Sequence, residues 1–187
     1  MSITNTDIQG LLVVQWETYG DDRGFFRQTY QVRELSQALG REVVLRQGNH
    51  SHSVPGVLRG FHAEPWDKLV YVVRGYAMAA IADIRPQSPT FGEVRTFMLG
   101  EPPNGERVRL FIAEGLANSF VTLGTEPVDY LYDVSGYWSA GVSQPAVAWD
   151  DPDLAVDWPV HDPVLSDKDR ANPRLRDLYS DHPRFAD

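Results

Sequence analysis

The sequence predicts an all-β domain, either a sandwich or a barrel. Many short runs of β-forming residues follow one another along the chain, and 13 prolines and 15 glycines break them apart. Short strands with frequent Gly and Pro punctuation are typical of this class. One clear short helix is expected at Val32–Leu39, where Gly40 is placed to end it.

The remaining elements are expected in a fixed order. A strand over 13–19 leads into a turn at 20–24 and an extended segment over 25–30. The later strands are expected at 57–62, 68–73, 76–84, 95–99, 108–112, 119–123, 128–134 and 146–149. The tail from about residue 151 is rich in Asp and Pro and is expected to be irregular, with a helical turn near Lys168. The length suits one domain over 1–187.

The composition excludes several classes of protein. The absence of cysteine excludes a disulfide scaffold, thiol catalysis and cysteine-based metal sites. A formal net charge of −9 argues against binding to nucleic acid. No apolar run approaches the ~18 residues of a membrane span, and the first residues lack a signal-peptide pattern. We therefore expect a cytoplasmic protein with no nucleic-acid or membrane partner.

Two histidines offer a metal site as one hypothesis. His50 and His52 share one face of an extended segment because strand side chains alternate with a period of two. Barrels of the cupin type often bind metal with such a pair and a later third histidine. Here the later segment holds Asn118, which replaces an imidazole poorly at a transition-metal site. A surface pair is favoured, and no metal is expected.

His62 is a candidate for acid–base chemistry, since it ends one predicted strand and Lys68 opens the next. Strand periodicity groups His62 with Gly60 on one face and Arg59 with Phe61 on the other. An imidazole suits proton transfer near neutral pH. Each of these side chains also has an ordinary explanation: a strand histidine is often a hydrogen-bonded core group, and surface charges are usually solvated.

A series of motifs along the chain carries a family resemblance. They are Asp22-Arg23-Gly24-Phe25-Phe26, Gln47-x-Asn49-x-Ser51-x-Ser53, Val57-Leu58-Arg59-Gly60-Phe61-His62, Lys68-Leu69-Val70, Ser88-Pro89-Thr90-Phe91-Gly92, Glu114-Gly115-x-Ala117-x-x-Phe120, Trp149-Asp150-Asp151-Pro152 and Leu165-Ser166-x-Lys168-Asp169. In this order they resemble the dTDP-4-dehydrorhamnose 3,5-epimerase family, over about 20–169. The resemblance implies one cupin-type double-sheet jelly roll, a homodimer, a nucleotide-diphosphate sugar as substrate, and neither metal nor cofactor.

The resemblance also implies a reaction, the epimerisation of a 4-keto-6-deoxy nucleotide sugar at C3, C5 or both. By position, His62 matches the catalytic base and Asp169 the acid that orients it. Lys68 matches the lysine near the 4-keto oxygen, and Tyr132 the tyrosine that returns a proton from the opposite face. The implied substrate contacts are Arg23, Phe26, Gln28, Gln47, Asn49, Arg59, Asn118, Lys168 and Trp138, the last stacking on the base.

Some positions depart from the family pattern. Asn118 stands where the family has a substrate-facing histidine, Gln28 replaces a usual Glu, and Ser143 stands where a Glu contact is expected. These departures favour a related 4-keto nucleotide sugar, or inversion at a single carbon. Two alternatives remain at this point: a non-catalytic cupin that binds a nucleotide sugar or carbohydrate, and a metal-dependent cupin that uses His50 and His52.

Overall fold

The computed structural model describes residues 2–139 and 145–185. Its strands are β1 (Ser2–Asn5), β2 (Leu11–Gln15), β3 (Thr18–Asp21), β4 (Gly24–Arg27), β5 (Gln47–Ser53), β6 (Leu58–Ala63), β7 (Lys68–Arg74), β8 (Tyr76–Asp83), β9 (Val94–Gly100), β10 (Val108–Ile112), β11 (Leu116–Leu123) and β12 (Val128–Val134). Its helices are α1 (Val32–Leu39), α2 (Asp167–Arg170) and α3 (Leu175–Leu178), followed by a 3₁₀ turn at Pro183–Phe185.

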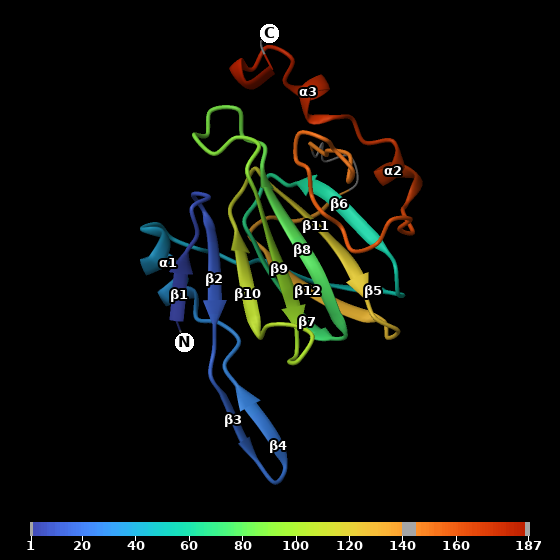
Figure 1. Cartoon of the computed structure of the whole chain (residues 1–187). Helices are drawn as coiled ribbons and strands as arrows, with labels where there is room; N and C mark the ends of the chain where they lie inside the picture. Colours follow the sequence, from blue (N-terminus) through green and yellow to red (C-terminus); the bar gives the residue numbers. More distant parts are fainter. Residues whose placement is uncertain (1, 140–144, 186–187) are drawn as a thin grey trace.

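Within these residues the strands form two larger sheets and one hairpin. A six-stranded antiparallel sheet has the order β1-β2-β10-β7-β12-β5, and a four-stranded one has the order β6-β11-β8-β9. Strands β3 and β4 pair only with each other. The prediction of an all-β, double-sheet jelly roll with a few short helices is confirmed (Figure 1).

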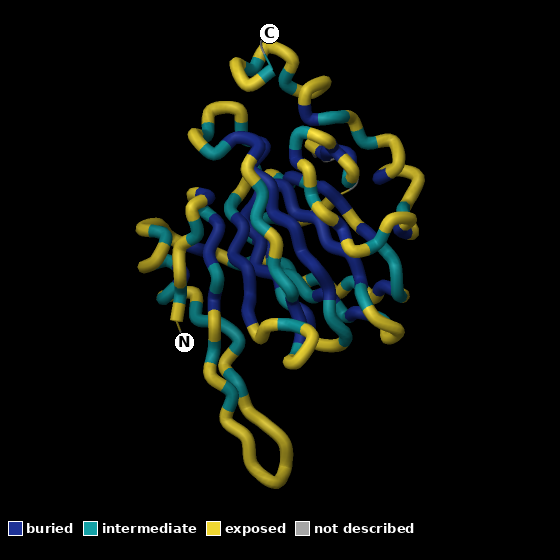
Figure 2. Tube along the Cα trace, viewed as in Figure 1, coloured by how far each residue is buried: buried dark blue, intermediate teal, exposed yellow. Residues whose placement is uncertain are grey.

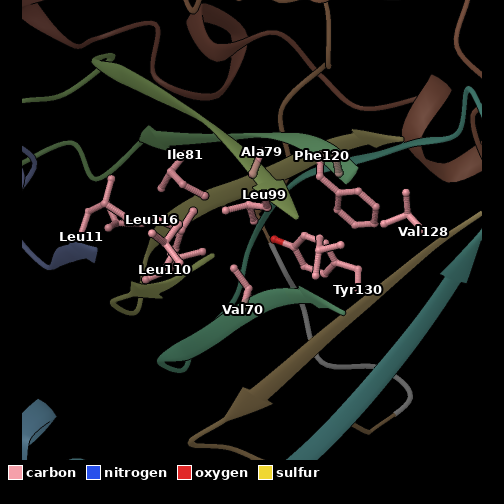
Figure 3. Close-up of a cluster of buried hydrophobic side chains, with 14 of the residues drawn as sticks. Leu11, Val70, Ala79, Ile81, Leu99, Leu110, Leu116, Phe120, Val128 and Tyr130 are labelled. Atoms are coloured by element: carbon pink, nitrogen blue, oxygen red, sulfur yellow. The ribbon is translucent and has the colours of Figure 1, made fainter. Parts of the chain in front are cut away.

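The main core lies between the two sheets. Val70 of β7 and Leu110 of β10 come from the six-stranded sheet, and Ala79 and Ile81 of β8 face them from the other (Figure 3). Because strand side chains alternate, every second residue of these strands points into the core. The intervening residues need separate cover on each outer face.

That outer cover differs between the sheets. Helix α1 places Leu35 over Leu12 and Phe111 of the six-stranded sheet. The C-terminal tail covers the four-stranded sheet, where Trp158 packs against Phe61 at a ring distance of 6.0 Å. The tail therefore crosses β6, and this crossing brings α2 beside that strand.

Most predicted elements are confirmed, with some differences, one of which is that β1 was not predicted. Gly40 ends α1 in the left-handed conformation, with φ of 65°, and the helical turn near Lys168 is α2. The segment predicted as one strand over 13–19 is divided between β2 and β3. The strand predicted at 146–149 is wrong: Val147 exchanges two backbone hydrogen bonds with Phe61, but the chain turns at Trp149 and Asp150 before a strand can form.

The β3–β4 hairpin projects away from both sheets, on the side of the molecule opposite the C-terminal tail (Figure 1). Its residues are almost all exposed (Figure 2). Among the residues that the structure describes, no helix is both long and apolar enough to cross a membrane.

Candidate active site

A cavity of about 220 Å³ opens where the two sheets meet α2. Its walls come from β5, β6, β7, β11, β12, α2 and the β6–β7 loop. The lining residues are Ser51, Arg59, His62, Glu64, Lys68, Asn118, Phe120, Tyr130, Tyr132, Ser166, Lys168 and Asp169. All four residues expected to act in catalysis therefore share one cavity.

A bulge in β6 aims His62 into this cavity. The pairing of β6 with β11 matches His62 to Asn118 and Arg59 to Phe120, so two β6 residues lie opposite one β11 residue. The expectation from simple alternation, that Arg59 and His62 face opposite sides, is therefore wrong, because a bulge resets the alternation. Gly60 permits it: its φ is +116°, and a Cβ there would lie 2.5 Å from the Asn118 carbonyl oxygen.

His62 pairs with Asp169 of α2, with 2.6 Å between Nε2 and Oδ1. Asp169 lies 107 residues after His62 in the chain. The N-terminal cap of α2 fixes its position, because the Asp169 backbone N–H donates to Ser166 Oγ at 3.1 Å. Burial alone would raise the pKa of Asp169, but hydrogen bonds from His62 and Ser166 outweigh it and hold that pKa below its usual range. The pair is thus a carboxylate facing an imidazole N–H.

Lys68 lies on the other side of the cavity, at the start of β7. Its ammonium makes an ion pair with Glu64, and both side chains are largely buried. Nζ lies 5.1 Å from the ring centre of Tyr132 on the neighbouring strand β12. Burial, and then the negative charge of Glu64, raise the pKa of Tyr132, so its hydroxyl keeps its proton at neutral pH.

Tyr130 and Asn118 occupy another wall of the cavity. The Tyr130 ring stacks on Phe120 with centroids 4.0 Å apart, and both rings lie in the main core (Figure 3). The Tyr130 hydroxyl lies 3.4 Å from Asn118 Nδ2. Burial raises the pKa of Tyr130 well above its ordinary value. This wall is therefore polar but neutral.

The mouth of the cavity carries further predicted contacts. Arg59 and Lys168 line it, and Arg59 Nε donates to Ser53 Oγ at 3.0 Å. Asn49 is paired with Tyr132 across β5 and β12. It also accepts a 2.7 Å hydrogen bond from Gln47, whose own oxygen accepts from the Trp138 backbone. Gln47, Asn49 and Trp138 thus form one connected group beside the cavity.

Three predicted contacts lie elsewhere. Arg23 is at the tip of the β3–β4 hairpin, where it pairs with Asp21, and Phe26 is exposed on β4. Gln28 follows β4 and accepts a hydrogen bond from Gln31. None of the three lines the cavity of its own chain. Ser143, where a further contact was expected, lies outside the described residues.

His50 and His52 do not face the cavity. They lie on the outer face of β5, and both contact Asp129 Oδ1, at 2.9 and 2.6 Å. Over residues 2–139 and 145–185 no group of three or more His, Cys, Asp or Glu side chains is arranged to bind a metal ion.

Sequence reasoning did not assign several cavity residues. Ser51 and Tyr130 are two positions from Asn49 and Tyr132, so strand alternation alone places them on the same face. Glu64 had no such signal because it lies in the loop between β6 and β7. Its four-residue spacing from Lys68 suggests a pair only when the loop turns as it does here.

Comparison with known proteins matches this fold and cavity. The sequence model of one family, described as dTDP-4-dehydrorhamnose 3,5-epimerase, matches residues 5–177. The chain belongs to the dTDP-4-dehydrorhamnose 3,5-epimerase family. The member from Shigella flexneri is 37% identical over 174 residues, which cover 90% of this chain and 93% of that protein.

Solved structures of family members agree. A 4-keto-6-deoxy sugar epimerase from Streptomyces spheroides superimposes with a TM-score of 0.89 at 30% identity, covering 97% of this chain and 90% of its own. An epimerase from Legionella pneumophila, solved with dTDP-4-keto-L-rhamnose, gives a TM-score of 0.86 at 34% identity, covering 96% and 95%. The resemblance seen in the motifs is confirmed, and the chain is an isomerase of this epimerase family with the cupin-type jelly roll.

Proposed function

We propose that this epimerase inverts a 4-keto-6-deoxy nucleotide sugar at C3, C5 or both, by removing a proton from one face of the ring and returning one to the other. One observation carries the proposal. The His62–Asp169 pair and the Lys68–Tyr132 pair line the same cavity from opposed sheets. A sugar ring held between them meets a base on one face and an acid on the other.

His62 is the proposed base. The 4-keto group acidifies the C–H bonds at C3 and C5, so a positioned imidazole can remove these protons. Because the Asp169 carboxylate only accepts hydrogen bonds, Nε2 carries the proton and Nδ1 is the nitrogen free to act as a base. The carboxylate then stabilises the imidazolium that forms.

Lys68 is the proposed electrostatic partner of the enolate. When the C–H bond breaks, its electron pair moves to the ketone and negative charge develops on the oxygen. A fixed, largely buried ammonium stabilises that charge more strongly than water does. No redox step is needed, because the electron pair returns to carbon when the ring is reprotonated.

Tyr132 is the proposed acid. It stands on β12 of the six-stranded sheet, whereas His62 stands on β6 of the four-stranded sheet. Its raised pKa means that the hydroxyl holds a proton over the neutral range. Proton return by Tyr132 inverts the carbon, whereas return by His62 restores the original configuration.

The nucleotide diphosphate is proposed to bind at the cavity mouth. Arg59 and Lys168 concentrate positive charge there in a chain of net charge −9. Guanidinium groups bind phosphate oxygens through charge-assisted, often bidentate, hydrogen bonds. The exposed ring of Trp138 is the proposed platform for the base. The relative solved with dTDP-4-keto-L-rhamnose favours thymine as that base.

A homodimer is proposed to complete the site. Arg23 and Phe26 match substrate contacts by resemblance, but they lie on a hairpin that points away from the sheets (Figure 1). Both side chains are largely exposed, and the hairpin's two strands form a separate sheet within the described residues. The hairpin can therefore extend over the cavity of a second copy of the chain, so that Arg23 and Phe26 of each subunit contact the substrate bound by its partner.

Asn118 is proposed to make the two carbons unequal. It replaces a histidine of the family at a cavity wall and contacts Tyr130. A small change in how the ring sits alters which C–H bond His62 can reach, since a shift near ~1 Å costs about 10²-fold in rate. We expect exchange at C3 to be faster than at C5.

The test follows deuterium by NMR while the enzyme is incubated in D₂O with a panel of 4-keto-6-deoxy nucleotide sugars of differing base and sugar. The proposal expects solvent deuterium at C3, and more slowly at C5, of at least one sugar. A sugar that binds without any exchange at either carbon supports the non-catalytic alternative and overturns the proposal. Equal rates at C3 and C5 from the earliest points contradict the role given to Asn118.

A further inference from the structure

Glu64 is an acidic side chain inside a cavity proposed to receive an anionic enolate. It lies in the β6–β7 loop, and only a small part of its side chain is exposed. Among the described residues, the Lys68 ammonium is the group that compensates the charge at Oε2. A buried carboxylate near a developing negative charge is unfavourable unless it pairs with a cation, and here that cation is the Lys68 ammonium.

The geometry makes Glu64, Lys68 and Tyr132 one unit. Lys68 is held on one side by the Glu64 carboxylate, and its Nζ is 5.1 Å from the Tyr132 ring centre. Its side chain is largely buried, and burial disfavours an ammonium without a counter-charge. The other charged or titratable side chains that line this cavity are Arg59, His62, Tyr130, Tyr132, Lys168 and Asp169. Among these, Asp169 is the carboxylate, and it is already paired with His62.

We propose that Glu64 is a positioning residue that holds the Lys68 ammonium at the ketone oxygen and keeps Tyr132, the proposed proton donor, in its protonated form. The role rests on the proposed function of the site and adds to it a residue that contacts the catalytic lysine, not the substrate. The carboxylate fixes the ammonium before the substrate arrives, so the enolate meets a charge that is already in place.

The same charge acts on the proposed acid. Burial first, and then Glu64, raise the pKa of Tyr132. A Tyr132 that loses its proton can no longer protonate the ring from its side of the cavity. Loss of the Glu64 charge therefore moves the alkaline limit of activity to lower pH.

The test compares the wild type with Glu64→Gln, which keeps the shape of the side chain and removes its charge. In kcat/KM measured against pH, the ratio of variant to wild type should lie below one at low pH, because the ammonium is less firmly held. The ratio should fall further as pH rises, because the variant reaches its alkaline limit at a lower pH. Glu64→Asp, which keeps the charge, should restore most of the profile. Glu126→Gln is the matched control, because Glu126 is exposed and, among the residues that the structure describes, pairs with Arg74 alone.

A second readout does not depend on turnover. The chain has two lysines, Lys68 and the exposed Lys168, so trace labelling with acetic anhydride followed by mass spectrometry compares Lys68 with an internal reference. Only an amine without its proton reacts. Loss of the counter-charge should raise the Lys68-to-Lys168 labelling ratio above that of the wild type, because an adjacent negative charge favours the ammonium over the amine.

Two results would overturn the role of Glu64: an unchanged labelling ratio in Glu64→Gln, or a loss of activity that is equal at every pH. Failure of the wild type to exchange any sugar is a different result. It contradicts the proposed function, while the labelling ratio still reports whether Glu64 controls the charge of Lys68.

Discussion

The cavity and the β3–β4 hairpin represent two ways of presenting functional side chains. The cavity draws His62, Lys68 and Tyr132 from both sheets and fixes them by packing and ion pairs. The hairpin carries Arg23 at its tip, with 89% of its side chain exposed, and Phe26 on β4, which is 70% exposed. Within the part of the chain that the structure describes, its two strands pair only with each other.

The cavity therefore suits proton transfer, whereas the hairpin suits contact with a molecule outside its own chain. Proton transfer needs groups held to within a fraction of an ångström, and the rigid space between two packed sheets provides this. Two strands by themselves are marginal, so the hairpin contributes little to the fold of its own chain. Its exposed aromatic and cationic residues are explained by contact with something outside the chain, for which we propose the partner cavity.

The largest expected effect is on the cavity side of this comparison. His62→Ala should lower exchange at both C3 and C5 by ~10²–10⁴-fold, because it removes the positioned base. Time-resolved NMR in D₂O measures this directly. Asp169→Asn keeps the shape of the side chain but removes the charge that stabilises the imidazolium. Its exchange rate should lie between those of the wild type and His62→Ala. Near-normal exchange at both carbons in His62→Ala would show that another group is the base.

On the hairpin side, Arg23→Ala should lower kcat/KM by about tenfold or more, through loss of a charge-assisted bond to the diphosphate. A mixture of Arg23→Ala and His62→Ala proteins, unfolded together and refolded, should be more active than either protein alone. Mixed dimers then contain one cavity with an intact His62 that receives an intact Arg23 from the partner. A mixture with no more activity than Arg23→Ala alone would place Arg23 at its own cavity or outside the site.

The smallest effects concern the free energy of unfolding, where the packed sheets and the hairpin should again differ. Asp83 is fully buried and accepts hydrogen bonds from Arg85, Ser88 and Thr90. Asp83→Asn should lower the free energy of unfolding by about 2 kcal/mol at neutral pH, a loss typical of buried charged hydrogen bonds. Phe26→Ser should leave the unfolding of the isolated subunit nearly unchanged. Urea unfolding of each variant measures both effects.

The pH dependence of the Asp83 effect has a definite sign. Burial alone would raise the pKa of Asp83, but the hydrogen bonds from Arg85, Ser88 and Thr90 outweigh it, so the folded pKa lies below the ordinary value. A carboxyl with a depressed folded pKa stabilises above its unfolded pKa, and the stabilisation is lost as pH falls through the folded pKa. The difference in the free energy of unfolding between the wild type and Asp83→Asn should therefore become smaller below about pH 4. A gap that widens there would contradict this account of Asp83.

Strand patterns predicted the sheets well because alternation and Gly or Pro breaks are local signals. The run that became β8 and the helix α1 ended by Gly40 were both evident in the sequence. The His62–Asp169 pair was not accessible in this way. The two residues are 107 positions apart and meet only because the tail crosses β6. The family resemblance supplied that pairing, and the structure supplies its geometry.

Some family motifs line the cavity, whereas others only stabilise the fold. The Ser-Pro-Thr-Phe-Gly turn carries a family signature, yet Ser88 and Thr90 serve the buried Asp83 and do not approach the cavity. The bulge at Gly60 could not be foreseen from strand alternation, since it requires the close approach of β11. Residue type thus predicted chemistry better than it predicted which face a residue would occupy.

The central claim is that His62 and Tyr132 act on opposite faces of the sugar ring. Tyr132→Phe in D₂O tests it most directly, because it leaves the base and removes the acid. The account predicts that deuterium still enters the ring with the original configuration retained, as His62 returns a deuteron to the face from which it took the proton, while inverted product falls to a small fraction of the wild-type rate. Inverted product at the wild-type rate, or the loss of exchange together with inversion, would contradict it.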